Sequence, residues 1–243
     1  MFDSHLSELV MIAAPIIFLA YLVRGICGFG SGLIAIPVLS LMFPLKVAVP
    51  LVVMLDYLAS AGHGVSLRQS IQWREIARLI VPALFGVSAC LLIFHEVDAE
   101  LLTRFLGGFV FLYALYALWG PEMPRASSWW ALPAAFSGGA VGTLFGTGGP
   151  LYVTYLKARQ LDKTAFRATF ACIFILDGAA RVTGYVGTAV VDIQLLFLLA
   201  MSLPVMILGM YLGGKIHTNL SAESFTRAIS ILLLASGASL MLR

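Results

Sequence analysis

Charged residues are scarce in this chain, at 11% of its 243 residues, whereas soluble domains carry about 25%. Apolar residues make up 60% of the sequence, and its mean hydropathy is +0.98. This composition excludes an ordinary soluble domain, in which about 45–50% of residues are apolar. The sequence therefore predicts an integral membrane protein.

Motifs typical of enzymes are also missing. The sequence contains no H-E-x-x-H, no nucleotide-binding G-x-x-x-x-G-K-[ST], and no G-x-S-x-G with a credible base. The three cysteines, Cys27, Cys90 and Cys172, lie in apolar runs without metal-binding spacing, so no metal or cofactor is expected. The formal charge of +3 is too small to indicate nucleic-acid binding. These absences predict that the chain is not an enzyme.

Two glycine-rich breaks interrupt the apolar runs, one at residues 25–37 and one at residues 142–150. Each is followed by a short apolar segment, residues 33–43 and residues 151–156. Segments of this length are too short to cross about 30 Å of hydrocarbon as straight helices. Non-helical backbone at membrane depth is tolerated only where protein or a water-filled cavity covers it. Two such breaks at corresponding places predict the binding site of a transporter.

An internal repeat is visible around these breaks. Residues 98–104 (Asp-Ala-Glu-Leu-Leu-Thr-Arg) and 221–227 (Ser-Ala-Glu-Ser-Phe-Thr-Arg) share Ala, Glu, Thr and Arg at the same spacing, and both open a final apolar helix. The predicted units are residues 1–120 and 129–243, with a linker at residues 121–128. At roughly 20 residues per span, the sequence predicts an all-α integral membrane protein of two inverted pseudo-symmetric repeats. It would have about eight to ten membrane segments, including two short broken or re-entrant helices.

Lys and Arg are distributed unequally between the predicted loops of the two halves. The connection after the third helix of the first half is basic. Its counterpart in the second half has no Lys or Arg and instead has Asp192. The turn before the third helix shows the opposite bias. The basic residues of these loops are Arg68, Arg74 and Arg78 in the first half, with Lys46 alone in its turn, and Lys157, Arg159, Lys163 and Arg167 in the second half. Because cytoplasmic loops are enriched in Lys and Arg, this swap predicts inverted halves, with both termini outside.

The glycine breaks themselves are the first candidate substrate-binding site. Their backbone N–H groups lie where a short helix begins, and a helix N-terminus attracts anions. The candidate residues are Gly28, Phe29, Gly30, Ser31, Gly146, Thr147, Gly148 and Gly149. The alternative interpretation is close helix packing through small residues, which is common in membranes.

Ionisable residues inside apolar helices are the second group of candidates, because burying their charge is expensive. Asp177 and Arg181 are four residues apart and are expected to share one helix face, where they can pair. Asp56 has no obvious local partner. Both aspartates are candidates for gating or proton coupling, although a purely structural pair is the alternative. Arg24, beside the first break, is predicted either to contact an anion or to be a snorkelling interfacial anchor. Arg181 is the other arginine predicted to bind the anion.

The chain resembles the sulfite exporter TauE/SafE family of multi-pass prokaryotic membrane proteins. The resemblance depends on Gly28-Phe-Gly-Ser-Gly32 with Lys46-Val-Ala48, and on Gly146-Thr-Gly-Gly-Pro150 with Lys163-Thr-Ala165. The sequence departs from the usual pattern at Pro150 and Arg167. The resemblance implies export of a small sulfur-containing anion such as sulfite, sulfoacetate or a related organosulfonate, and location in the prokaryotic cytoplasmic (inner) membrane.

These observations together predict a secondary transporter that exports this anion by alternating access. The expected partners are a small anionic substrate and membrane lipid, and homo-oligomer formation is left open. The alternatives are a non-transporting scaffold or partner subunit, a transporter of thiosulfate or sulfate, and, less well supported, a membrane-embedded enzyme. The identity of the anion, the direction of transport and its coupling are not determined by the sequence.

Overall fold

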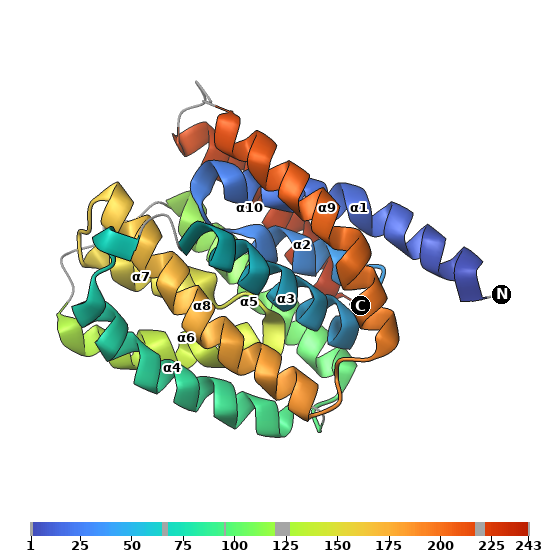
Figure 1. Cartoon of the computed structure of the whole chain (residues 1–243), viewed down its shortest axis with the longest axis horizontal. Helices are drawn as coiled ribbons and strands as arrows, with labels where there is room; N and C mark the ends of the chain where they lie inside the picture. The colour runs from blue at the N-terminus through green and yellow to red at the C-terminus, as the bar shows by residue number, and fades with distance from the viewer. Residues whose placement is uncertain (1, 65–67, 95, 120–126, 217–221, 243) are drawn as a thin grey trace.

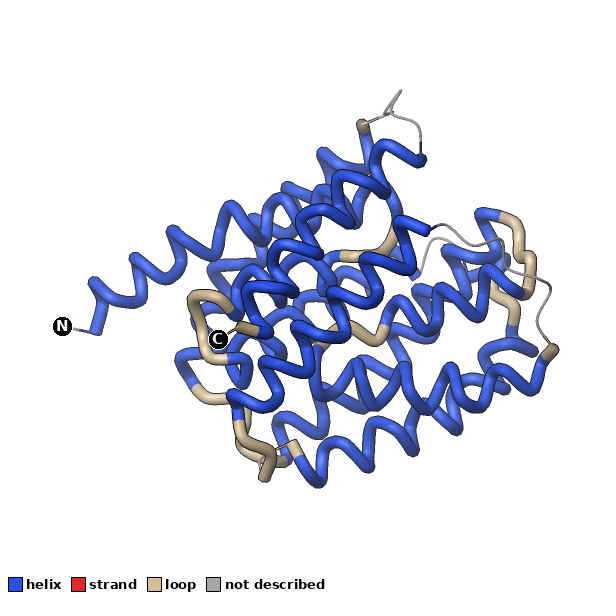
Figure 2. The backbone as a smooth tube through the Cα atoms, turned by 180° about the vertical axis from the view of Figure 1, so that it is seen from behind, coloured by secondary structure: helices blue, strands red, loops and turns tan. Residues whose placement is uncertain are grey.

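A computed structural model describes residues 2–64, 68–94, 96–119, 127–216 and 222–242. Of these, the side chains of residues 2–10, 62–64, 68, 163 and 222–228 are not described. The described chain is helical throughout and contains no strand, as Figure 2 shows. The elements are α1 (Phe2–Cys27), α2 (Ser31–Ser40), α3 (Leu45–Gly64), α4 (Trp73–Ile93), α5 (Ala99–Trp119), α6 (Ala131–Phe145), α7 (Gly149–Ala158), α8 (Lys163–Gly187), α9 (Ile193–Lys215) and α10 (Ala222–Met241), with short 3-10 helices at Arg68–Ser70 and Ser128–Trp130.

Each glycine-rich break ends one helix and precedes a shorter one. Gly30, just before α2, has a φ of 101°, and Gly146, just after α6, has a φ of 64°. Side chains rarely tolerate this left-handed conformation, so glycine allows the chain to turn there. The short helices α2 and α7 have 10 residues each, about 15 Å. The prediction of two short segments is confirmed, although α7 extends two residues beyond the predicted segment at each end.

The helices follow the same order twice: a first helix, a short helix and then three longer ones (Figure 1). The first helix of each half packs on the fourth helix of the other half, because α1 contacts α9 and α6 contacts α4. Helices α3 and α8 pack on each other, as do α5 and α10. The two halves are therefore interleaved along most of their length.

The two short helices run towards opposite ends of the molecule. Helix α2 ends at Ser40, which lines a cavity together with Ala99 and Glu100 at the start of α5. Helix α7 is followed by Arg159, whose side chain pairs with Glu75 near the start of α4. Since α4 has 21 residues, about 30 Å of helix separates its start from the start of α5. The hairpins α1–α2 and α6–α7 thus return to different ends.

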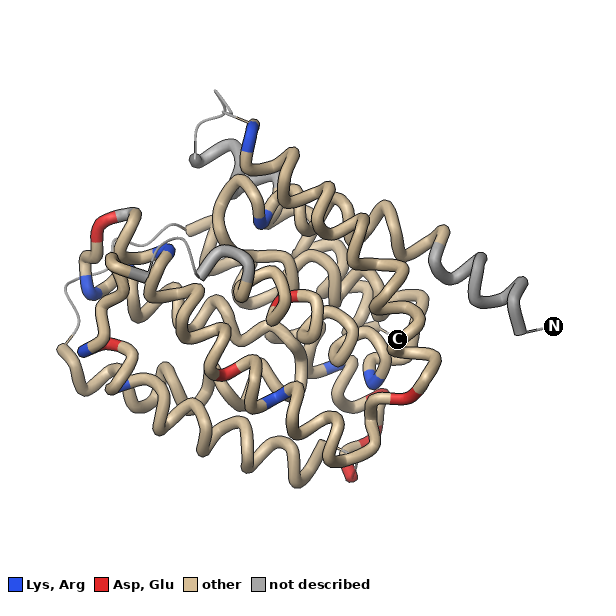
Figure 3. The backbone as a smooth tube through the Cα atoms, viewed as in Figure 1, with Lys and Arg blue, Asp and Glu red and all other residues tan. Residues whose placement is uncertain are grey.

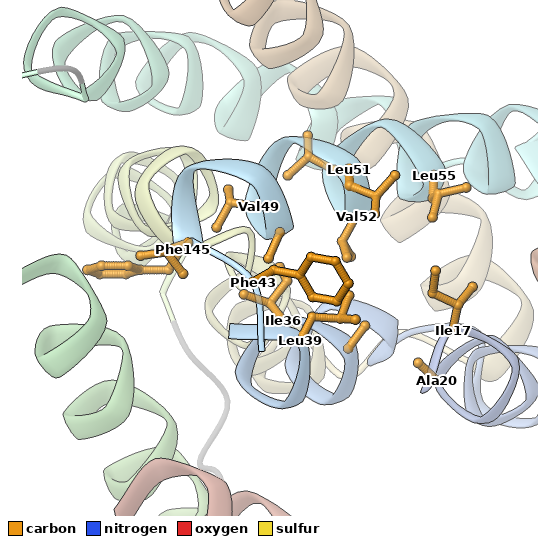
Figure 4. Close-up of a cluster of buried hydrophobic side chains, with 14 of the residues drawn as sticks. Ile17, Ala20, Ile36, Leu39, Phe43, Val49, Leu51, Val52, Leu55 and Phe145 are labelled. Carbon is orange, nitrogen blue, oxygen red and sulfur yellow. The ribbon is translucent and has the colours of Figure 1, made fainter. Parts of the chain in front are cut away.

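Apolar side chains from α1, α2 and α3 form one core at the first hairpin. Ile36 and Leu39 of α2 face Val49 and Val52 of α3 in Figure 4, and Ile17 reaches the same cluster from α1. Phe145, at the end of α6, also packs there. A second cluster joins α4, α6, α7 and α8. The two cores hold the two glycine breaks in fixed positions near the centre of the bundle.

Several helices are long enough to span a membrane. In the described part of the chain, Trp73–Ile93, Ala99–Trp119, Thr164–Gly187 and Ile193–Lys215 meet the length and hydropathy that a span needs. Shorter apolar helices are Met11–Cys27, Ser31–Ser40 and Ile229–Met241. The prediction of a multi-pass, all-α membrane protein is therefore confirmed at this level.

Charged residues gather towards the two ends of the bundle, and few lie between them (Figure 3). One end, called the basic end below, includes Arg78 on α4, Arg159 after α7, and Arg167 in the second turn of α8. Positive loops face the cytoplasm in membrane proteins, so this end matches the predicted cytoplasmic side. Arg125 and most of the predicted 121–128 linker lie outside the described residues, as do the side chains of Arg68, Lys163 and Arg227.

Candidate functional site

The two glycine breaks meet at the centre of the molecule. A Cβ atom added to Gly32 would lie only 2.7 Å from the carbonyl oxygen of Gly146. A Cβ atom added to Gly146 would collide with the end of the Ile36 side chain. The backbones of the two hairpin tips therefore approach as closely as glycine allows. This contact brings residues about 115 positions apart in sequence into one candidate site.

A small cavity of about 20 Å³ lies at this meeting point and is called the central cavity below. Its lining residues come from both hairpins and from the third helix of each half. They are Arg24, Phe29, Gly30, Gly32, Leu33, Asp56, Gly146, Thr147, Gly149, Pro150, Phe170 and Phe174. A volume of this size holds about one water molecule. The conformation described here is therefore closed around the centre.

Arg24, Ser31, Asp56 and Tyr21 form a buried group, called the first cluster. The Arg24 guanidinium lies 2.7 Å from Asp56 Oδ1 and donates a 2.9 Å hydrogen bond to Ser31 Oγ. Ser31 and Tyr21 each donate a hydrogen bond of 2.6 Å to the same carboxylate oxygen of Asp56. Arg24 is only 5% exposed, so its interpretation as a snorkelling anchor is wrong. The partners of Asp56 are distant in sequence, since Arg24 and Tyr21 reach it from α1 and Ser31 reaches it from α2.

The second cluster contains Tyr152, Asp177 and Arg181. Asp177 and Arg181 form a buried ion pair on α8, and Tyr152 of α7 donates a 3.0 Å hydrogen bond to Asp177. The predicted pairing of these residues on one helix face is confirmed. The same three residue types, Tyr, Asp and Arg, thus recur in both halves. In each cluster, a residue of the hairpin is bound to the third helix of the same half.

Phe174 lies between the two clusters. Its ring centroid is 5.9 Å from the guanidinium carbon of Arg24 and 6.0 Å from that of Arg181. Phe170 stacks on Phe174 at 4.5 Å, and Phe29 from the first break contacts Phe170 edge-on at 5.8 Å. Aromatic faces attract guanidinium groups. The ring therefore positions both arginines and separates them.

Hydrogen-bond donors at the breaks remain available. Among the described residues, no side chain caps the N-terminus of α2 or of α7, and the first N–H groups of a helix have no partner within it. Helix α7 offers fewer such donors, because Pro150 has no N–H group and the Leu151 N–H donates to the Gly148 carbonyl. The Thr147 hydroxyl is buried and has no hydrogen-bond partner among the described residues. Buried polar groups without a partner are rare and point to a function. Ser31 differs, because its hydroxyl is already engaged by Arg24 and Asp56.

The predicted site residues divide into four sets. Phe29, Gly30, Thr147 and Gly149, together with Arg24, Asp56 and Gly146, line the central cavity. Ser31 is bound to two of these residues, while Asp177 and Arg181 approach them through Phe174. Gly28 lines a neighbouring cavity. Gly148 instead packs against the backbone of Gly138, so the packing interpretation applies to that glycine.

Sequence reasoning missed Tyr21, Tyr152 and Phe174. A tyrosine in an apolar helix gives no sign of its partner, because the partner depends on tertiary packing. Tyr21 is three residues before Arg24 and therefore on the same helix face, which was a usable signal. Phe174 is likewise three residues before Asp177 on α8, so the same signal was available for it, whereas none identified Tyr152.

Comparison with known proteins finds relatives of this chain. The family model described as "Sulfite exporter TauE/SafE" matches residues 13–240. The chain is 27% identical over 199 residues to "Probable inner membrane transporter protein TsaS" of Comamonas testosteroni, covering 78% of this chain and 81% of that protein. It is 25% identical over 224 residues to "Probable sulfite/organosulfonate exporter TauE" of Cupriavidus necator, covering 89% and 88% respectively. No solved structure matches the chain.

Proposed function

This chain belongs to the sulfite exporter TauE/SafE family, and from that premise we propose that it exports a small sulfur-containing anion by alternating access. The family is one of membrane transporters, which confirms that the chain is a multi-pass transporter and not an enzyme. The proposed substrate is sulfite, sulfoacetate or a related organosulfonate, as the name of the Cupriavidus relative suggests. The proposed location is a prokaryotic cytoplasmic membrane, since the Comamonas relative is named for the inner membrane.

One observation carries the proposal: two buried arginines each lie about 6 Å from the same Phe174 ring, and each is paired with an aspartate. A guanidinium group binds sulfonate-like oxyanions as it binds a carboxylate, through parallel N–H donors. Leaving a buried charge unpaired costs several kcal/mol. An incoming anion therefore competes with Asp56 or Asp177 for the guanidinium, and the displaced carboxylate must take up a proton to avoid remaining as an unpaired buried charge.

The proposed path runs from Arg24 to Arg181. Arg24 lies in the last turn of α1, beside Arg167 at the basic end, whereas Arg181 lies in the part of α8 that leads away from that end. We interpret the repeated helix order, the exchanged packing of α1 and α6, and the opposite directions of α2 and α7 as inverted repeats. Rocking of one repeat against the other would then expose each arginine to a different side.

The proposed driving force is the anion gradient together with the membrane potential. The 243 residues contain no nucleotide-binding motif. A negative interior favours anion exit by about 2.3 kcal/mol per charge per 100 mV. Protonation of a displaced aspartate would add proton coupling. In that case, a pH gradient across liposomes containing the protein would change the rate of anion flux.

Flux in liposomes tests the proposal. The purified protein is reconstituted with internal sulfite, sulfoacetate or thiosulfate, and anion release is compared with protein-free vesicles and with a Thr147→Val variant. This substitution preserves shape and removes only the unpartnered hydroxyl, so we expect an increase in KM of about threefold to tenfold. Absence of flux for every anion would favour the alternative of a non-transporting scaffold.

A further inference from the structure

A second cavity adjoins the central cavity and is larger, at about 80 Å³. We call it the outer cavity. Its lining residues are Arg24, Gly25, Gly28, Ala59, Ser60, Arg167, Ala171 and Met210. Whereas the central cavity holds about one water molecule, this volume holds several, which is enough for a small oxyanion. Of these two cavities, therefore, the outer one has room for the substrate class in this conformation.

Arg24 forms the wall between the two cavities, because it lines both. Its Nη1 atom faces Ser31 and Asp56 on the central side, at 2.9 and 2.7 Å. Its Nη2 atom donates a 2.6 Å hydrogen bond to Ser60, which lines the outer cavity, and a longer one of 3.3 Å to the backbone carbonyl of Asp56. One guanidinium group thus presents donors towards both spaces.

Arg167 supplies a second positive charge to the outer cavity. Its side chain is exposed and donates a 3.1 Å hydrogen bond to the carbonyl of Ile26. Among the residues that the structure describes, no carboxylate forms an ion pair with Arg167, and none lines the outer cavity. The cavity therefore has an unneutralised cation at its mouth and a neutralised one at its inner wall.

We propose that the outer cavity is a separate binding site for the transported oxyanion, held by Arg167, Arg24 Nη2 and the Ser60 hydroxyl. This inference rests on the proposed function. A sulfonate or sulfite group binds there first and then displaces Asp56 from the other edge of the Arg24 guanidinium. Since the cavity is at the basic end, the site loads the anion from the cytoplasmic side before export. The phosphate of a lipid headgroup shares this chemistry, and the experiment separates the two sources.

A native cysteine provides the readout. Cys27 lies between Ile26, which accepts the Arg167 hydrogen bond, and Gly28, which lines the cavity. Cys27 is partly exposed, whereas Cys90 and Cys172 are buried. In an uncharged detergent, we expect an anionic methanethiosulfonate reagent to modify Cys27 about tenfold faster than a cationic one. Sulfoacetate should slow the anionic reaction several-fold, with mass spectrometry identifying the modified peptide.

Two variants make the result specific. Arg167→Gln should abolish both the charge preference and the sulfoacetate protection, and Arg167→Lys should restore the preference. Arg74→Gln is the matched control, because it removes an exposed arginine near the start of α4 that does not line the cavity. If Arg74→Gln and Arg167→Gln changed the labelling rates of Cys27 equally, the charge preference would come from the general surface potential of the protein. That result would overturn the proposal.

The lipid alternative is tested by adding phosphatidylglycerol instead of sulfoacetate. Protection by the lipid but not by sulfoacetate would identify a headgroup site and overturn the proposal. The labelling needs no transport, so it can succeed where the proposed export fails. In vesicles that do show flux, Arg167→Gln should raise KM about threefold to tenfold and leave kcat within twofold, because the central site is intact.

Discussion

The two buried clusters contain the same three residue types but are constructed differently. In the first cluster, Arg24 and Asp56 come from separate helices and are 32 positions apart. In the second cluster, Asp177 and Arg181 are four positions apart on α8. Arg24 lines both cavities, whereas Arg181 lines neither of them. The first ion pair therefore joins two helices of the first half, while the second is a local feature of one helix.

This difference suggests how the same chemistry can serve two roles in one transport cycle. In the proposed cycle, exchange of Asp56 for an anion at Arg24 would break the side-chain link from α1 to Asp56 of α3. Exchange at Arg181 loosens only the contact that Tyr152 makes from α7 to Asp177. The first cluster is thus suited to gating the entry of the anion, and the second to holding its charge on the far side of Phe174.

The largest expected effect follows from Arg24→Gln. This substitution leaves Asp56 buried without its counter-charge, which costs about 3–5 kcal/mol in the free energy of unfolding. Flux in liposomes should fall at least a hundredfold, because the proposed anion ligand is lost. The double variant Arg24→Gln/Asp56→Asn removes both charges and should recover most of the stability in a thermal unfolding assay, but not the flux.

The double variant also separates folding from function. Normal flux in a folded Arg24→Gln/Asp56→Asn protein would show that this pair has a structural role only. The same double change at Asp177 and Arg181 provides the comparison. If the anion passes Phe174 and then binds Arg181, the Asp177→Asn/Arg181→Gln variant must lose flux as well.

A smaller difference is expected between the two tyrosines. Asp56 accepts hydrogen bonds from Tyr21 and Ser31 and forms an ion pair with Arg24. Among the described residues, Asp177 accepts a hydrogen bond from Tyr152 and forms an ion pair with Arg181. Removing one hydroxyl donor to a buried carboxylate costs about 1.5–3 kcal/mol. We expect Tyr152→Phe to be at the upper end of this range and Tyr21→Phe at the lower end. Chemical unfolding of both variants in one detergent measures the difference, and an equal cost would contradict it.

Alanine substitutions at the two glycine breaks should differ in their cost in the free energy of unfolding by a similar amount. Gly30 and Gly146 both have positive φ, but only Gly146 also lacks space for a Cβ atom, because of Ile36. Gly30→Ala should therefore cost about 1–2 kcal/mol from backbone conformation alone. Gly146→Ala should cost more, since the Ile36 side chain must also move. Combining Gly146→Ala with Ile36→Val should recover part of the added cost in the same unfolding assay.

Local patterns account for what could be predicted from the sequence. Composition predicted an all-α membrane protein, and the glycine breaks predicted the two short helices. The pairing of Asp177 with Arg181 was predictable because four residues make about one helical turn. Each of these features depends on neighbours within a few positions of the chain.

The remaining features depend on tertiary packing, which one sequence does not encode visibly. The partnership of Arg24 with Asp56 requires side chains of α1 to reach α3, and the position of Phe174 requires both clusters to lie near one ring. The same limit applies to Gly148, whose packing on Gly138 separates it from the other glycines of its break. Sequence reasoning therefore located the site and several of its residues, but not the contacts that give them different roles.

The smallest effect is expected at a third ion pair, which has the same spacing as Asp177–Arg181 but lies at the surface. Glu100 and Arg104 are four positions apart on α5, with side chains 63% and 55% exposed. Solvent screens such a pair, so Arg104→Gln should change the free energy of unfolding by about 0.5 kcal/mol or less. Arg181→Gln, which breaks the same spacing in a buried setting, should cost several times more in the same assay. Similar costs for the two variants would mean that burial does not distinguish the pairs, and the special role assigned to the second cluster would lose its physical basis.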